Sequence, residues 1–171
     1  MLTIEIQVGN IVRQPDCDAI VNSANERMRA GSGVCGAIHA AAGPELEECS
    51  HKLAPLAVSE AKITPAFNLP NRWVIHARGP HYLLYEGDPK AALATCIRNV
   101  LLVAEHNGIK RLAIPAISTG IFKYPIGEAA QVIINAIQDV GSQVPSIELV
   151  RVTVLNDADA SVFRSAQDVS R

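Results

Sequence analysis

The residues best suited to chemistry lie in a glycine-rich stretch near the N-terminus, where residues 29–43 read RAGSGVCGAIHAAAG. The glycines from Gly31 onward have the spacing G-x-G-x-x-G, which is typical of loops that bind dinucleotide cofactors. That motif needs its first glycine directly after a strand and an acidic residue at the end of the next strand. Here eight residues, 23–30, separate the expected strand from Gly31, and the acidic residues Glu47 and Glu48 fall in an expected helix. We therefore expect neither a nicotinamide nor a flavin cofactor.

The same glycines suit a phosphate group. Glycine lets backbone N–H groups approach an anion, and a helix expected from Val34 would add its own unpaired N–H groups and its dipole. A second loop, Ser118-Thr119-Gly120-Ile121, offers hydroxyl groups and another glycine after an expected strand. Two such loops at one sheet edge could hold a diphosphate, although an ordinary tight turn explains either loop alone equally well. Neither loop continues into Gly-Lys-Ser/Thr, which argues against a Walker-type nucleotide hydrolase.

The alternation of strands and helices predicts the fold that must position these loops. Strands are expected at residues 3–8, 19–22, 60–64, 72–77, 111–116 and 147–155, and helices at 34–42, 45–53, 92–107, 126–140 and 157–168. On the first helix, the expected apolar face consists of Val34, Ala37, Ile38 and Ala41. We therefore expect one α/β domain over residues 1–171, with helices on both faces of a mostly parallel sheet. In such a sheet the ligand crevice lies beyond the carboxyl ends of the strands, where both loops fall.

Composition narrows the function classes. The chain has 171 residues, 49% of them hydrophobic, and a net charge of −2 without a run of Lys or Arg, so we do not expect a nucleic-acid partner. No apolar run approaches the ~20 residues that span a bilayer, and the start of the chain does not read as a signal peptide. The four cysteines are scattered without a CxxC pair, which indicates free thiols and a cytoplasmic location.

A metal site is the weaker alternative for the polar residues of this region. Cys35, His39, Cys49 and His51 supply four potential ligands. Their spacing matches no common zinc motif, and the second pair falls on a different expected helix. We therefore expect no metal.

Four blocks of the sequence, DAIVNSAN, GSGVCGAIHAAAG, VIHARGP and IPAISTGIFKYP, resemble in order and spacing the signature blocks of the macro domain family. The resemblance runs from Gly9 to about residue 157 and is closest to the bacterial stand-alone type associated with O-acetyl-ADP-ribose deacetylation and removal of ADP-ribose from proteins. It implies a three-layer α/β/α fold with a mixed sheet of six or seven strands. It also implies an ADP-ribose cleft between the two loops, no cofactor, and ADP-ribose, O-acetyl-ADP-ribose or ADP-ribosylated proteins as partners.

The resemblance also assigns roles to residues. Asn25 matches an asparagine that binds the distal ribose, and His39 lies where a histidine or an aromatic residue often stands, so these two are the candidate catalytic residues. A packing role explains His39 as well, and Asn22 could equally bond to local backbone. Phe122 matches an aromatic residue that flanks the distal ribose. The candidate ligand-binding residues are Asn10, Ile11, Asn22, Asn25, Gly31, Ser32, Gly33, Val34, Cys35, Gly36, Ser118, Thr119, Gly120, Ile121, Phe122 and Asn156.

Three positions depart from the family pattern. Asn10 stands where the family usually has an aspartate that accepts a hydrogen bond from the adenine amine, so this bond should be weaker here. Asn156 stands near the place where many members stack an aromatic residue on adenine. Cys35 stands where hydrolytic members often have an aspartate that orients or activates water, and a thiol with a pKa of ~8.5 is a poor base at neutral pH.

Three functions therefore compete. The first is a hydrolase that cleaves an ester or glycosidic link at the distal ribose of ADP-ribose. The second is an ADP-ribose-binding module without activity, and the third is a regulator that binds nucleic acid. Position 35 separates the first two, because Cys35 should make an enzyme slow. The chain shows no second domain that a binding module would serve, which favours the enzyme, and the acidic charge balance argues against the regulator.

Overall fold

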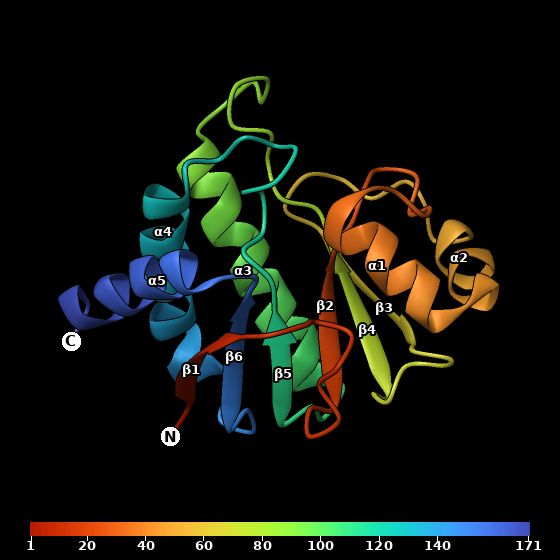
Figure 1. Cartoon of the computed structure of the whole chain (residues 1–171), viewed down its shortest axis with the longest axis horizontal. Helices are drawn as coiled ribbons and strands as arrows, with labels where there is room; N and C mark the ends of the chain where they lie inside the picture. The colour runs from red at the N-terminus through yellow and green to blue at the C-terminus, as the bar shows by residue number, and fades with distance from the viewer.

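Six strands form the central sheet of the computed structural model, which describes residues 1–171 (Figure 1). They are β1 (Thr3–Val8), β2 (Ala19–Ser23), β3 (Ala61–Pro65), β4 (Trp73–Ala77), β5 (Arg111–Ile114) and β6 (Leu149–Val154). Their order is β1-β6-β5-β2-β4-β3, and only β3 runs antiparallel to its neighbour. Five strands therefore end at one edge of the sheet, and the expected mixed, mostly parallel sheet is confirmed.

Five helices cover the two faces of this sheet (Figure 1). Ile20 on β2 packs in one core with residues of α1 (Gly33–Ala42) and α2 (Pro44–His51). Its neighbours Ala19 and Val21 point to the opposite face, into a larger core built with α3 (Pro89–His106), α4 (Ile126–Val140) and α5 (Asp157–Val169). This period-two alternation produces the expected three layers. None of these helices combines the length and hydropathy that a membrane crossing requires.

Element boundaries differ from the sequence expectation by a few residues, for local reasons. The helix α3 begins at Pro89 rather than Ala92, because Asp88 accepts a hydrogen bond from Lys90 N at 3.0 Å and proline is tolerated in the first turn. The strand β5 ends at Ile114, since Pro115 has no N–H group to donate to a neighbouring strand.

The buried face of α1 differs from the expected one. The expected face included Ala37 and Ala41, which are exposed, whereas the side chains turned inward are Cys35, Ile38, His39 and Ala42. The helix carries small or apolar residues almost all round, so several sets of positions satisfy helical spacing and the pattern alone does not choose between them. The candidate site residues Cys35 and His39 therefore face the sheet.

A buried arginine anchors the loop that follows β1. Arg151 on β6 is almost fully buried and donates to Asp16 Oδ1 at 2.8 Å and to Asp16 Oδ2 at 2.7 Å. It also donates to Gln14 Oε1 at 2.9 Å, and Gln14 in turn donates to the carbonyl oxygen of Asn10 at 2.9 Å. The hydrogen bond from Arg151 lowers the pKa of Asp16 well below its ordinary value. This loop, and with it Asn10, is therefore held by hydrogen bonds that start inside the sheet.

Candidate ligand-binding site

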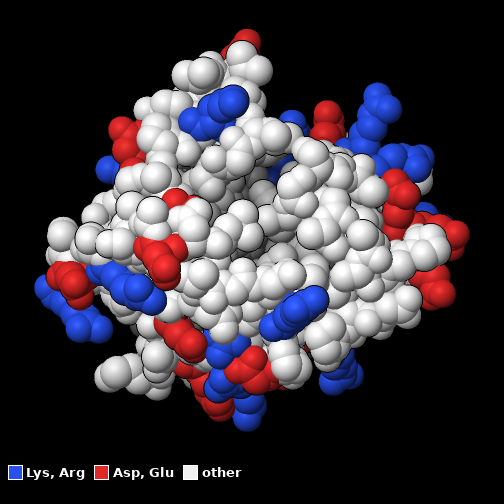
Figure 2. All heavy atoms as spheres, in the orientation of Figure 1, with Lys and Arg blue, Asp and Glu red and all other residues white.

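The predicted site residues lie along the carboxyl edge of the sheet, in the order of its strands. Asn10 follows β1, Asn156 follows the adjacent β6, the second loop follows β5, and the first loop follows β2. Figure 2 shows the molecule hollowed above these strand ends, and most of the surface around the hollow belongs to uncharged residues. The sheet order therefore aligns the predicted contacts in one row along an elongated cleft.

The first loop presents free backbone N–H groups at the start of α1. The N–H groups of residues 32–35 donate to no other group of the chain, and the first intrahelical bond runs from Gly36 N to Ser32 O at 3.3 Å. Gly33 has a positive φ of 58°, and a Cβ atom there would meet nothing within 4 Å. At Gly36 a Cβ atom would instead collide with the carbonyl oxygen of Gly31. This loop combines open space, unpaired N–H groups and a helix N-terminus, which is a suitable setting for a phosphate.

One hydroxyl group of the second loop is bonded within the chain, and the other is buried without a hydrogen-bond partner. Thr119 Oγ1 donates to Ala116 O at 2.7 Å, and the buried Ser118 lies so close to Gly79 that a Cβ atom there would collide with Ser118 Oγ. What the loop leaves free are the backbone N–H groups of residues 120–122, which donate to no group of the chain. The loop sequence predicts ligand contacts by the hydroxyl groups. These backbone amides are further candidates for ligand contact, and contact by Ser118 and Thr119 stays a prediction. The position of Ser118 also explains why residue 79, in the VIHARGP block, is glycine.

Asn25 and Cys35 meet at one backbone carbonyl. Asn25 Nδ2 donates to Arg29 O at 2.8 Å, its Oδ1 accepts from Arg29 N at 3.2 Å, and Cys35 Sγ donates to the same Arg29 O at 3.4 Å. A Cβ atom at Gly31 would lie 3.3 Å from Asn25 Nδ2 and 3.7 Å from Cys35 Sγ, so these residues converge beneath the first loop. One proton of the Asn25 amide is still free to donate to a ligand.

The predicted site residues Cys35 and His39 are buried beneath the cleft. Cys35 is 6% exposed, and burial raises the pKa of its thiol, which is therefore neutral near pH 7. His39 is 7% exposed, its Nδ1 is buried without a hydrogen-bond partner, and burial lowers the pKa of its ring. A neutral thiol that already donates its proton is not a base. The role of His39 in catalysis stays a prediction.

The far end of the row carries the two asparagines that depart from the family pattern. Asn10 is exposed, and its Oδ1 accepts from Val12 N at 3.1 Å, which leaves one lone pair for a ligand. Asn156 caps α5, because its Oδ1 accepts from Asp159 N at 2.8 Å. Capping accounts for the side chain of Asn156, and ligand contact by this residue stays a prediction. Ile11 is buried in the core below.

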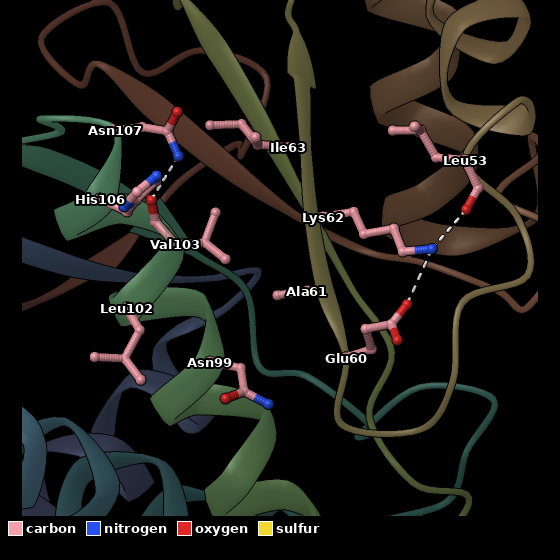
Figure 3. Close-up of a pocket in the computed structure, with 10 residues that line it drawn as sticks. All are labelled: Leu53, Glu60, Ala61, Lys62, Ile63, Asn99, Leu102, Val103, His106 and Asn107. Carbon is pink, nitrogen blue, oxygen red and sulfur yellow. Dashed lines mark hydrogen bonds and ion pairs between the residues drawn. The ribbon is translucent and has the colours of Figure 1, made fainter.

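A hollow of about 610 Å³ lies elsewhere, along the edge strand β3 and the second half of α3 (Figure 3). Its lysine is engaged within the chain, since Lys62 Nζ donates to Leu53 O at 2.6 Å and pairs with Glu60 at 3.1 Å. None of the predicted site residues lines it. The four potential metal ligands named above do not form a group that could hold a metal ion.

Comparison with known proteins places this geometry in a family. A family model described as the Macro domain matches residues 21–133. The chain belongs to the macro domain family. This macro domain is 39% identical to the macro domain-containing protein RSc0334 of Ralstonia nicotianae, over 91% of this chain and 89% of that protein. It is 38% identical to a protein of an Enterobacter species named O-acetyl-ADP-ribose deacetylase, over 94% of this chain and 91% of that protein.

Solved macro domain structures share the fold over almost the whole chain. A variant of the Oceanobacillus iheyensis macrodomain with ADPR superposes with a TM-score of 0.93 and 33% identity, covering 98% of this chain and 92% of that one. The Trypanosoma brucei macrodomain in complex with ADP-ribose gives 0.84 and 28%, covering 95% and 68%. The family and the three-layer fold that the sequence blocks implied are therefore confirmed.

Proposed function

We propose that this macro domain binds ADP-ribose in the cleft at the carboxyl edge of the sheet and slowly hydrolyses an ester on the distal ribose. The substrate would be O-acetyl-ADP-ribose or an ADP-ribosyl ester on a protein. The free cysteines are consistent with action in the cytoplasm, where thiols stay reduced.

The order of groups along the cleft carries this proposal. Two loops with unpaired backbone N–H groups lie side by side at the ends of β5 and β2, where they would hold a diphosphate between them. Asn10, beyond β1 on one side, would face the adenine, and Asn25 on the other side would hold the distal ribose. The printed names of relatives support the same ligand: one is called an O-acetyl-ADP-ribose deacetylase and one is solved in complex with ADP-ribose.

The proposed reaction uses water and the substrate's own phosphate. A water oxygen adds to the ester carbonyl carbon, the bond from that carbon to the ribose oxygen breaks, and the ribose oxygen takes a proton. Cys35 is a neutral hydrogen-bond donor, so it does not accept the proton of the water. The diphosphate held by the first loop would take that role, while Asn25 orients the ribose. A positioned general base contributes about 10²–10⁴-fold, so its loss at position 35 makes the proposed enzyme slow.

A second function is favoured by the same thiol. Cys35 donates its proton to Arg29 O and does not act as a base toward a water molecule. The site would therefore also suit a module that binds ADP-ribose without cleaving it. Incubation with O-acetyl-ADP-ribose, with release of acetate followed over time, separates the two. We expect slow release above the uncatalysed rate. Saturable binding of ADP-ribose without any release of acetate would show that the protein is a binding module.

Replacing Asn10 by Asp is expected to tighten ADP-ribose binding by about 1 kcal/mol, the difference between a charge-assisted and a neutral hydrogen bond. The carboxylate keeps the acceptor that Val12 N uses and adds a charge facing the adenine amine. Isothermal titration calorimetry measures the change. Asn68→Asp is the matched control, because Asn68 is an exposed asparagine in the turn between β3 and β4, away from the cleft. Equal affinities of Asn10→Asp and the unmodified protein would show that residue 10 does not face the base.

A further inference from the structure

A row of buried polar side chains runs beneath the distal-ribose end of the cleft. It crosses from the edge strand β3 to β4 and β2, on the face that α1 covers. Thr64, His76 and Asn22 form it, and each is at most 2% exposed. Thr64 Oγ1 lies 2.9 Å from His76 Nε2, and Asn22 Nδ2 lies 3.1 Å from His76 Nδ1. Neither Thr64 nor His76 was assigned a role in the sequence analysis.

The hydrogen bonds of this row have one consistent direction. Thr64 Oγ1 donates to Pro65 O at 3.0 Å, so it has no proton left and must accept from His76 Nε2–H. His76 Nδ1 is then unprotonated and accepts from the Asn22 amide nitrogen. Burial lowers the pKa of His76 to about 3, so the ring is neutral and carries one proton. The contact with Thr64 places that proton on Nε2. Thr64 thus decides which ring nitrogen carries the proton.

The row continues upward to the residues under the first loop. Asn22 Nδ2, held by His76, also donates to Cys35 Sγ at 3.8 Å, and Cys35 Sγ donates to Arg29 O at 3.4 Å. That carbonyl oxygen accepts from Asn25 Nδ2 as well, at 2.8 Å. Hydrogen bonds therefore connect the edge strand without interruption to the side chain that we place at the distal ribose.

We propose that His76 is a positioning residue for this end of the cleft. Its Nε2–H tautomer, imposed by Thr64, holds the amide of Asn22 with the nitrogen toward Cys35. With the other tautomer the amide would turn its oxygen to the ring, and Cys35 would lose its donor. The thiol would then shift against Arg29 O, and Asn25 with it. The effect on ligand binding rests on the proposed function, whereas the hydrogen-bonded row itself does not.

The first test uses the ligand-free protein. Long-range ¹H–¹⁵N correlation spectra of the histidine rings identify the protonated nitrogen, and His76→Gln assigns the His76 signals by their loss. We expect the proton of His76 on Nε2 at neutral pH. In Thr64→Val the acceptor of that proton is gone, so we expect a change to Nδ1–H and shifted backbone amide signals of Asn22, Cys35 and Asn25. Thr64→Ser keeps the hydroxyl and should keep the spectrum of the unmodified protein.

The second test adds ADP-ribose. Thr64→Val should weaken binding about five-fold, the effect of one lost hydrogen bond in the row, while Thr64→Ser restores it. Thr3→Val is the control, because Thr3 is a strand threonine at the amino end of β1, away from the row and from the cleft, and it should change neither the spectra nor the affinity.

Three results would overturn the inference: a proton of His76 on Nδ1 in the unmodified protein, a changed tautomer without any shift of the Cys35 and Asn25 amides, or a changed tautomer with unchanged ADP-ribose affinity. Absence of ADP-ribose binding by the unmodified protein would contradict the proposed function alone, and the ligand-free spectra would still decide the role of His76.

Discussion

The Gly33→Glu variant is expected to lose measurable ADP-ribose binding while keeping its fold. Gly33 begins α1 with a φ of 58°, and a Cβ atom there would point into open space where we place the diphosphate. A glutamate at this point fills that space and sets a negative charge against the phosphates. At about 4 Å such a repulsion is worth about 1–4 kcal/mol, depending on the effective dielectric, and bulk adds to it. We therefore expect affinity to fall about 100-fold or more in calorimetry.

The chain offers a matched control for the backbone strain. Gly108 also has a positive φ, of 68°, and a Cβ atom there would also meet nothing within 4 Å. It lies in the turn between α3 and β5, at the opposite edge of the sheet from the cleft. Gly108→Glu should lose similar stability and keep full affinity, and Gly33→Gln should separate bulk from charge. Retained affinity in a folded Gly33→Glu protein would show that the first loop is not part of the binding site.

Replacing Asn25 by Ala is expected to reduce the rate of O-acetyl-ADP-ribose hydrolysis about 100-fold, the order of effect that a small misplacement of the reacting groups produces. Asn25 would orient the distal ribose with its free amide proton, and its two bonds to the Arg29 backbone hold it in place. Steady-state kinetics distinguishes the two contributions. Loss of orientation lowers kcat, whereas a merely loosened loop raises KM. A variant with unchanged kcat would show that Asn25 takes no part in the reaction.

Cys35→Asp is expected to raise the same rate about 10²-fold, because a carboxylate supplies the general base that the thiol cannot. Asn22 Nδ2, which now lies 3.8 Å from Cys35 Sγ, would donate to that carboxylate and help to orient it. Cys35→Asn is the control, because asparagine has the shape of aspartate without its charge. This variant should stay as slow as the unmodified protein. If Cys35→Asp gains activity and the unmodified protein has none above background, this macro domain is a binding module. If neither variant nor parent turns over, hydrolysis at this site is excluded.

The sheet and the place of the cleft could be predicted because short, local patterns decide them. The apolar segment at residues 19–21 and the period-two alternation at residues 3–8 mark strands whatever surrounds them. The glycine spacing at residues 31–36 reflects a contact between residues five apart in sequence, since Gly36 must accommodate the carbonyl of Gly31. Constraints between residues this close in sequence can be recognised from one sequence alone.

Features that depend on contacts between distant segments could not be predicted. The apolar pattern of α1 left its buried face undetermined, and only the sheet below shows that Cys35 and His39 point inward. Arg151 reads as a polar interruption of a strand until the loop after β1 places Asp16 against it. His76 joins Asn22 across 54 residues of sequence, and no spacing rule connects them. In the second loop, Thr119 Oγ1 donates to Ala116 O and Ser118 Oγ is buried against Gly79, neither of which the loop sequence alone shows.

Titration calorimetry of the unmodified protein with ADP-ribose and with AMP tests the central claim most directly. AMP carries the adenine and one phosphate, but it lacks the second phosphate and the distal ribose that the two loops and Asn25 would contact. If the cleft holds the whole ligand, ADP-ribose binds more tightly than AMP, with one ligand per chain. Equal affinities, or no binding of ADP-ribose, would contradict the proposal that these loops and Asn25 form an ADP-ribose site.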